Sequence, residues 1–405
     1  MTISYHLRGI PGLSAPGIFL PWLTLSLLYL LLAGEPRAFA QVHITGQAAA
    51  GWRQSESGSS QYSYNSGKGS FNWRGDLFLD AELSDNVLFL SSFRMEQDRR
   101  LDVDLFVIRV IDIFSLPLNI EAGETDIPFG NLGERRFPKN NPFLTLPLGR
   151  EHVTTLRSSD YELWTADGRY ASYGNGMKIL DGGLYDIGVK AFGTVGIVDY
   201  AFAVTNGMLS ATSNYGANGL SGHSGVGKMG RISVTPMIGL TLGASYAQGP
   251  FLREDIAYGS SYGYAGSHDP GSYPQETLGA DIDFSFEHFS FYGEAFFNSW
   301  DFAEEYGSPL DAFGYSAEAR YTILPRLSAG LRLAELRFNE ISREAYAAPA
   351  STAPWDRNVL RLEYAVGYRC SRETLLKAVY TWNKTFGYPG DPRDNTFGMQ
   401  TVVSF

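Results

Sequence analysis

The stretch LRLEYAVGYR, residues 360–369, alternates strictly between two kinds of side chain. In an extended strand, successive side chains point to opposite faces of the sheet. The first face is apolar and the second is charged or small, which indicates a strand that separates an apolar medium from water. The apolar face carries Leu360, Leu362, Tyr364, Val366 and Tyr368, and the other face carries Arg361, Glu363, Ala365, Gly367 and Arg369.

The same alternation recurs along the chain after residue 40, and it is clearest in 70–83, 275–287 and 312–323. Each segment is about ten residues long, which is the length that a tilted strand needs to cross a bilayer. The pattern is weak in 41–52 and 101–113, and 326–339 loses phase near Glu335, so the strand number lies between about 14 and about 18. We expect about sixteen strands, at 41–52, 70–83, 86–97, 101–113, 117–126, 177–192, 197–207, 226–236, 239–249, 275–287, 289–300, 312–323, 326–339, 357–370, 373–386 and 395–405.

The connections between these segments alternate in length. Outer-membrane barrels have short periplasmic turns and long external loops. All the long polar links here fall on one side, and both ends of the barrel segment fall on the short-turn side. We therefore expect the loops to face the cell exterior and the termini to face the periplasm. The expected external loops contain 53–69, 127–176, 208–225, 250–274, 302–311, 340–356 and 387–394.

A soluble β-sandwich also alternates, but its inner face is packed with apolar groups. Here the face opposite the apolar one carries charges and glycines instead. A closed barrel also removes the unpaired sheet edges that lipid could not hydrogen-bond. The sequence therefore predicts an all-β fold, a transmembrane antiparallel up-and-down β-barrel with lipid outside and water inside.

The strongly apolar run from Ile18 to Ala33 follows Arg8 and precedes the small-residue triplet Ala38-Phe39-Ala40. This arrangement is typical of a secretory signal peptide cleaved before Gln41. An uncleaved anchor is the alternative, but the run is short for a membrane span and Pro21 interrupts it. We expect residues 1–40 to be the signal peptide and residues 41–405 to be the barrel.

Charge and cysteine content exclude several classes of protein. The formal net charge of −11 makes the chain a poor nucleic-acid binder. The single cysteine, Cys370, cannot form an intramolecular disulfide, and no lipoprotein cysteine follows the apolar run.

The chain ends on an alternating strand, Phe397, Met399, Thr401, Val403 and Phe405, with a phenylalanine as the last residue. This resembles the terminal strand of bacterial outer-membrane porins. The resemblance implies a passive channel for small polar or charged solutes in the outer membrane, recognition of Phe405 by the barrel-assembly machinery, and a homotrimer surrounded by lipid. A Pro-Phe-Gly tripeptide at 128–130 after a strand is similar to the phosphate-selective porin group.

A sixteen-stranded barrel has a lumen too wide for side chains alone to fill. The longest link, 127–176, follows the fifth strand. A link of this length usually has a function beyond joining two strands. In general porins, a loop at this place in the order folds into the barrel and narrows it, so the resemblance implies a constriction loop here. Its candidate constriction residues are Arg135, Arg136, Lys139, Arg150, Glu134, Asp160 and Glu162.

Charged side chains on the polar face of the predicted strands are candidates for the pore wall, where they would select solutes by charge and size. The loop and the wall both carry charges of both signs, so the sequence does not decide between anion and cation selectivity. The wall candidates are Arg74, Arg94, Lys178, Lys190, Arg320, Arg361, Arg369 and Lys377, with Asp76, Glu82, Glu96, Asp281, Asp283, Glu294, Glu318 and Glu363.

An outer-membrane hydrolase and a surface adhesin or receptor are the alternative functions. A hydrolase needs a histidine beside a nucleophile or a carboxylate. No histidine of the barrel segment lies in such a motif, so we expect surface histidines, no catalytic residues, no metal and no cofactor. An adhesin would bind through its Gly/Ser/Tyr-rich loops, 208–225 and 250–274. The histidines are His43, His152, His223, His268 and His288.

Overall fold

The computed structural model describes residues 41–56, 69–97, 101–154, 156, 177–181, 185–210, 225–251, 273–301, 309–343, 351–386 and 394–405. The chain divides into two units, Met1–Ala40 and Gln41–Phe405, and all described residues belong to the second. No helix among these residues is long and apolar enough to cross a membrane.

Sixteen strands close into one antiparallel barrel, as the sequence predicts. The barrel closes because β1 pairs with both β2 and β18, so no edge is left unpaired. A separate two-stranded sheet, β14 (Glu340–Arg343) with β15 (Ser351–Pro354), extends the connection between β13 and β16. The barrel strands are β1 (Gln41–Ser55), β2 (Gly69–Ser84), β3 (Val87–Glu96), β4 (Leu101–Val110), β5 (Asn119–Asp126), β6 (Tyr185–Val195), β7 (Val198–Thr205), β8 (Gly227–Met237), β9 (Leu240–Pro250), β10 (Pro274–Phe286), β11 (Phe289–Trp300), β12 (Leu310–Leu324), β13 (Leu327–Phe338), β16 (Val359–Arg369), β17 (Thr374–Thr385) and β18 (Thr396–Ser404).

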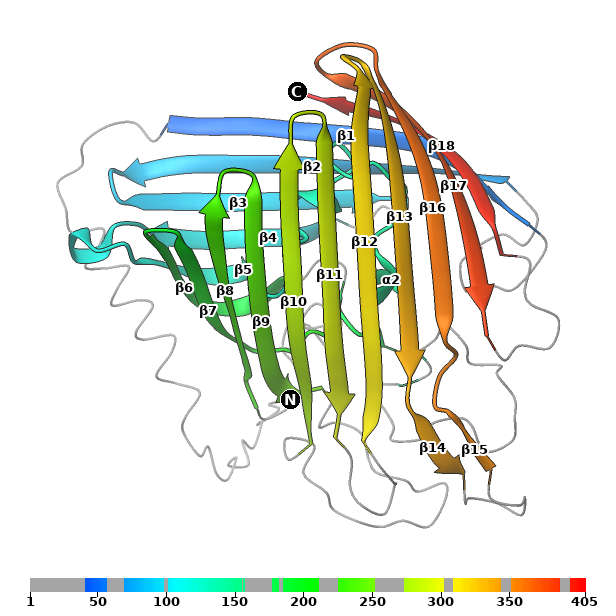
Figure 1. The fold of residues 1–405 in the computed structure, drawn as a ribbon. Helices are drawn as coiled ribbons and strands as arrows, with labels where there is room; N and C mark the ends of the chain where they lie inside the picture. Colours follow the sequence, from blue (N-terminus) through cyan, green and yellow to red (C-terminus); the bar gives the residue numbers. More distant parts are fainter. Residues whose placement is uncertain are drawn as a thin grey trace, which may run out of the picture. The chain divides into compact units, whose positions relative to one another are not determined.

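The short hairpin turns lie at one end of the barrel and the long connections at the other. Figure 1 shows the β8–β9, β10–β11 and β12–β13 turns at the same end as the carboxyl terminus. The last residue is held there by two backbone hydrogen bonds of 3.0 Å, one in each direction, between Phe405 and Gly46. This alternation of connection lengths matches the order expected from the sequence.

The two faces of the strands differ as the alternation predicts. Leu278 and Phe286 of β10 are 58% and 63% exposed on the outer face, whereas Asp281 between them is 6% exposed on the inner face. On β16, Arg361 and Glu363 point inward and are buried, whereas Tyr364 and Val366 point outward and are exposed. Charged side chains therefore line the inside of the barrel, and apolar side chains face outward.

The weak pattern of 101–113 has a structural cause. Val103 pairs with Phe93 and Leu105 pairs with Ser92, so Asp104 is an extra residue in a β-bulge. One extra residue reverses the parity of all that follow. The strand also ends at Val110, before a turn in which Asp112 has a positive φ of 53°.

The phase loss at Glu335 has a different cause, because β13 pairs with β12 without a shift there. Glu335 and Arg337 point outward and hydrogen-bond each other at 2.7 Å, while Leu336 and Phe338 point inward and are buried. A cation facing hydrocarbon costs about 2–4 kcal/mol, so this loop-side end of β13 belongs to the polar interface. The loss of phase in the sequence therefore marks the point where the inner face of β13 becomes apolar.

The strand predicted at 177–192 begins later, at Tyr185. Residues 177–181 instead run beside residues 153–156, with one bridge between Val153 and Lys178. The expectation that Lys178 is a wall residue is therefore wrong. An apolar alternation in 177–180 suggested a strand of the barrel wall, but Ile179 and Leu180 are fully buried in an apolar cluster.

Candidate functional site

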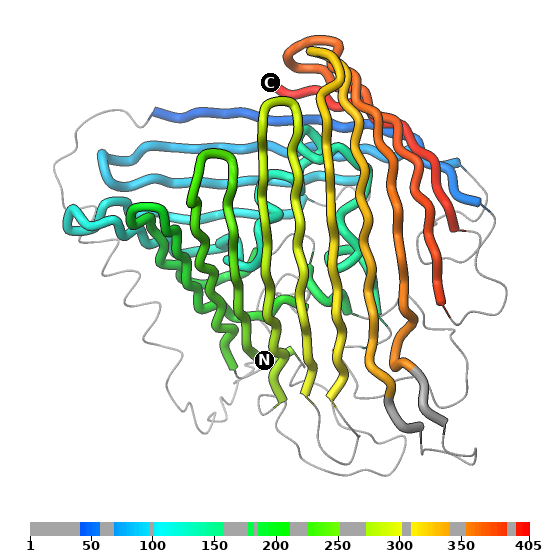
Figure 2. Tube along the Cα trace, in the orientation of Figure 1, coloured from blue at the N-terminus to red at the C-terminus, as the bar shows by residue number. Residues whose placement is uncertain are grey.

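The segment after β5 crosses the inside of the barrel, and residues 127–151 of it are called the inner loop below. Its parts contact inward-facing side chains of strands on several sides, and Figure 2 shows its trace passing behind β11, β12 and β13. It contains a short 3-10 helix, η2 (Gly133–Arg136), and one helical turn, α2 (Leu148–Glu151).

The inner loop begins with the tight turn Pro128-Phe129-Gly130. Gly130 has a φ of +65° and donates its backbone N–H to Ser245 Oγ of β9 at 3.0 Å. A Cβ on Gly130 would overlap the carboxylate of Glu294, and one on Gly279 would lie 2.9 Å from the Phe129 ring. Glycine is therefore required at both positions for the turn to approach the β9–β11 wall.

The second part of the inner loop, residues 138–151, is held by charged wall residues, and we call it the clasped half. Lys377 Nζ donates to the backbone carbonyls of Pro138, Asn141 and Phe143 at 2.9, 3.1 and 3.4 Å. Since all three donors of the ammonium group are used, Lys377 fixes this backbone to β17.

A buried ion pair fixes the clasped half to the neighbouring strands. Arg332 of β13 binds Glu363 of β16 with an Nη2–Oε2 distance of 2.5 Å, and both side chains are at most 1% exposed. Thr145 of the loop joins the pair, because Arg332 donates to its carbonyl at 2.9 Å and its hydroxyl donates to Glu363. The guanidinium also lies 4.2 Å from the Phe143 ring centroid.

Three further contacts complete the attachment of the clasped half. Arg150 pairs with Glu294 of β11 at 2.6 Å with both side chains buried, and Glu151 pairs with Arg361 of β16 at 2.6 Å. Arg53 of β1 donates to the Leu144 carbonyl at 2.8 Å.

The electrostatics of Glu151 follow from these contacts. Burial raises the pKa of its carboxyl, but the charge and hydrogen bond of Arg361 outweigh burial and hold the pKa below its ordinary value. Glu151 is therefore ionised at neutral pH, and the contact to β16 is an ion pair.

The first part of the inner loop, residues 127–137, carries two adjacent arginines, and we call it the open half. Arg135 Nη1 lies 3.1 Å from Asp283 Oδ2, and its guanidinium lies 3.6 Å from the Tyr292 ring centroid. Arg136 lies 4.3 Å from the Tyr185 ring centroid, and no carboxylate of the described residues is within ion-pair distance of it. Asp283 therefore neutralises Arg135, whereas the positive charge of Arg136 is not neutralised by a described carboxylate.

An apolar cluster lies inside the barrel, along the loop-side ends of β8 to β13. Its rings pack edge to face, with centroids 4.8 Å apart for Phe338 and Trp355 and 5.5 Å apart for Trp300 and Trp355. His152 is fully buried beside it, with Nε2 3.4 Å from Asp356 Oδ2, so the expectation of a surface histidine is wrong there. The cluster includes Leu148, Leu156, Met177 and Ile179 from the connection and Trp300, Leu310, Leu336 and Phe338 from the wall.

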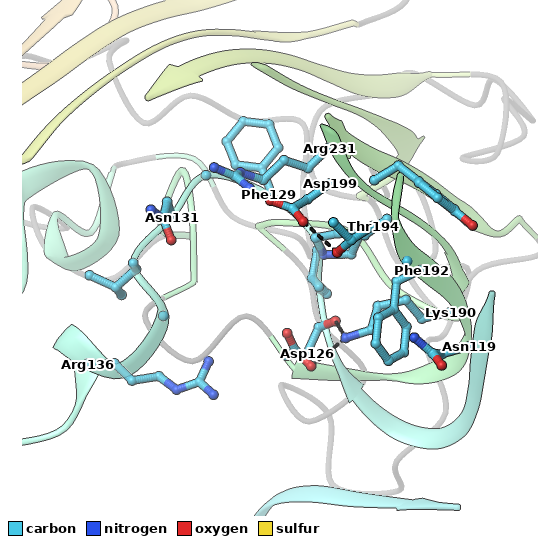
Figure 3. A pocket seen from close by; sticks show the side chains of 18 of the residues that line it. Asn119, Asp126, Phe129, Asn131, Arg136, Lys190, Phe192, Thr194, Asp199 and Arg231 are labelled. Carbon is cyan, nitrogen blue, oxygen red and sulfur yellow. Dashed lines mark hydrogen bonds and ion pairs between the residues drawn. The ribbon is translucent and has the colours of Figure 1, made fainter. Parts of the chain in front are cut away.

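A cavity of about 400 Å³ lies between the open half and the inner faces of β5 to β8. Figure 3 shows Arg136 on one side of it and the Asp126–Lys190 pair on the opposite side. Lys190 binds Asp126 at 2.6 Å and Glu121 at 2.7 Å, and Arg231 binds Asp281 at 2.7 Å. The inner face here is polar and its charges are largely paired.

The structure brings most of the predicted site residues to the inside of the barrel, but it distributes them differently. Glu134 and Lys139 are exposed on the inner loop, whereas Arg150 is buried. Asp160 and Glu162 lie outside the described residues.

The wall candidates fall into groups. Arg74 binds Asp76 at 2.8 Å and lies 4.0 Å from Glu96, and Arg94 binds Asp104 at 3.1 Å. Glu318 lies 3.7 Å from Arg332. Arg320 and Arg369 lie toward the short-turn end of the barrel, and neither has a carboxylate within ion-pair distance among the described residues. Glu82 on β2 lies toward the same end and is exposed.

Sequence reasoning missed three residues that organise the inside of the barrel, namely Arg332, Glu121 and Arg231. Each lies at the inward parity of its strand, so the alternation could have found them. Their importance comes from their partners, which are distant in the sequence. Among the described residues, no group of three or more His, Cys, Asp or Glu side chains is arranged to hold a metal ion.

No protein-family model matches the sequence, and no curated protein matches it. Solved structures do match: an anion-selective porin from Comamonas acidovorans aligns over 91% of this chain and 100% of its own, with a TM-score of 0.57 and 10% identity. The fold is that of the bacterial outer-membrane porins. The outer membrane channel DcaP of Acinetobacter baumannii aligns over 92% of this chain and 99% of its own, with a TM-score of 0.56 and 11% identity. OmpT, an outer membrane protein of Vibrio cholerae, aligns over 91% and 99%, with a TM-score of 0.55 and 10% identity.

Proposed function

We propose that this chain is a porin, a passive diffusion channel for small polar or charged solutes in the bacterial outer membrane. The observation that carries the proposal is a closed sixteen-stranded barrel with an apolar outer face and a charged inner face. Such a barrel is wide enough to hold water, and a polar inner face stabilises that water.

The inner loop supports a role as the constriction. It is held to the inner wall by ion pairs and hydrogen bonds on β1, β9 to β11, β13, β16 and β17, so it reduces the open cross-section. Charges on a fixed loop across a narrow water-filled gap select solutes by size and charge.

The test is conductance of the purified protein in a planar bilayer, with the reversal potential measured in asymmetric salt. We expect discrete ohmic channels. A protein that inserts but never conducts would overturn the proposal and favour an adhesin or receptor barrel, and hydrolysis of lipid or peptide would favour a barrel hydrolase.

The oligomeric state and the porin subgroup are further proposals. The Vibrio cholerae protein OmpT has a trimer form, and we propose a homotrimer here, which cross-linking in membranes would test. For the phosphate-selective group the support is Pro128-Phe129-Gly130 alone, and block of the chloride current by phosphate is the expected result.

We also propose that residues 1–40 are a signal peptide and that Phe405 is read by the barrel-assembly machinery. Mass spectrometry of the membrane-inserted protein should find Gln41 at its amino terminus. Phe405 is 71% exposed on the outer face, which leaves its ring accessible. Replacing Phe405 by Asp should slow insertion, and unchanged assembly kinetics would contradict a terminal signal.

A further inference from the structure

The cavity beside the open half has the size and lining of a binding site rather than of a plain water path. Its volume of about 400 Å³ falls in the range of small-molecule pockets. One wall is the beginning of the inner loop, and the other is the inner face of β5 to β8, so both walls belong to the proposed pore. The inference below therefore rests on the proposed function.

Four cations reach the cavity surface, and three of them are already paired. Lys190, Arg150 and Arg231 each bind a carboxylate, namely Glu121, Glu294 and Asp281, none of which lines the cavity. These carboxylates lie behind the cations, so the cations are partly neutralised but still present donors. Arg150 Nη1 is buried and has no hydrogen-bond partner among the described residues.

Arg136 is the fourth cation and differs from the others. No carboxylate of the described chain lies within ion-pair distance, and its buried Nε has no hydrogen-bond partner there. It sits in the last turn of η2, between the rings of Phe137 and Tyr185, whose centroids lie 5.1 and 4.3 Å from its Cζ. Figure 3 shows its guanidinium directed into the open space. Aromatic packing holds this group in place, and its donors are left for a ligand.

The rest of the lining limits the charge and shape of that ligand. Asp126 and Asp199 also line the cavity, so a second negative charge on the ligand would meet carboxylates. Phe192 is partly exposed on the same wall and lies 5.3 Å from Lys190 Nζ. Flat apolar surface beside a cation suits a ring or short hydrocarbon that bears one carboxylate.

We propose that this cavity is a binding subsite for small organic monocarboxylates, with the carboxylate on the Arg136 guanidinium and the apolar body against Phe192. The planar guanidinium matches a carboxylate through two parallel hydrogen bonds. Occupancy of the subsite enriches such solutes inside the lumen and speeds their passage over that of chloride or of dianions.

The test is calorimetric titration of the full-length, detergent-solubilised barrel with benzoate, and with phthalate and phosphate as comparisons. In a buffer above the second pKa of phosphate, where phosphate and phthalate are both mainly dianions, we expect benzoate to bind more tightly than either. Arg136→Gln should lower benzoate affinity by about 10- to 100-fold, which is the loss expected for a bidentate charge-assisted contact. Arg136→Lys keeps the charge but loses the planar guanidinium. Its benzoate affinity should therefore fall between those of the unmodified protein and Arg136→Gln.

Arg372→Gln is the matched control, because it removes the same charge from the exposed turn between β16 and β17. It should bind benzoate as the unmodified protein does. Equal benzoate binding by Arg136→Gln, or tighter binding of phosphate or phthalate, would overturn the proposal. Bilayer conductance of the same preparation separates the two claims: channels without benzoate binding refute the subsite alone, and benzoate binding without channels refutes the porin function alone.

Discussion

The two halves of the inner loop differ in whether their charged residues have partners. In the clasped half, the charges that contact the wall have named partners, as with Lys377 and the Arg332–Glu363 pair. In the open half, Arg135 is paired and Arg136 next to it is not. We propose from this comparison that the clasped half determines how wide the pore is, whereas the open half determines which charge a solute meets.

The largest effect should come from breaking the buried pair under the clasped half. Glu363→Gln leaves the Arg332 guanidinium buried without its main partner, and removing one member of a buried pair costs about 3–5 kcal/mol. We expect a loss of that size in denaturant unfolding from lipid vesicles, together with larger and noisier single-channel currents.

Glu82→Gln is the control, since Glu82 is exposed and no described cation lies within ion-pair distance. Replacing Arg332 and Glu363 together by Met should restore most of the stability, because no charge is then left buried. If the single and double variants unfold alike, the pair does not hold the loop.

A smaller effect is expected at Lys377, where neutral carbonyls rather than a carboxylate are the partners. Lys377→Met removes three hydrogen bonds and should cost about 2 kcal/mol. Conductance should rise because residues 138–143 are no longer tied to β17. Lys228→Met, on the exposed outer face of β8, should change neither quantity; equal conductance in both variants would contradict the assignment.

The adjacent arginines of the open half allow a direct test of selectivity. Neutralising Arg136 removes one charge near the solute path, which at about 7 Å in water amounts to about 0.6 kcal/mol for each ion. Because anion and cation are affected in opposite directions, the anion-to-cation permeability ratio should fall by about sevenfold. Arg135→Gln should shift the ratio in the same direction, because Asp283 is left uncompensated.

Asp283→Asn in the Arg135→Gln background should bring the ratio back toward that of the unmodified protein, because the ion pair is then removed whole. Reversal potentials in asymmetric salt measure this, and the differences should shrink as salt rises. Asp283→Asn alone should raise the ratio, because it leaves Arg135 uncompensated; a ratio that Asp283→Asn changes in neither background would mean that Asp283 does not neutralise Arg135.

The smallest effect concerns pH. The pKa of Glu151 is lowered in the folded state by Arg361, so this ion pair stabilises the fold above the unfolded pKa and is lost as pH falls through the folded one. The stability difference between the unmodified protein and Glu151→Gln should therefore be constant from about pH 7 to about pH 5 and vanish only in stronger acid. A difference that already falls near neutral pH would contradict the ion pair.

Much of the fold could be predicted because lipid and water impose a rule that is local in the sequence. Alternation with a period of two is visible within ten residues, as in 360–369, and it places Arg361 and Glu363 inward without any knowledge of the fold. The connection lengths placed the short turns at one end of the barrel and the long connections at the other. Errors occurred where a local exception broke the rule, at the Asp104 bulge and at 177–181.

The sequence by itself determined the barrel, the separation of short turns and long connections to opposite ends, and the inward parity of the wall charges. Only the tertiary structure decided which charges are neutralised, because the partners are far apart in the chain: Arg135 and Asp283 are separated by 148 positions, and Glu151 and Arg361 by 210. It also decided that Leu336 and Phe338 line an apolar interior, since the depth of a residue depends on how neighbouring strands are staggered. Parity is a property of one strand, whereas pairing and depth are properties of the closed barrel and of the loop that crosses it.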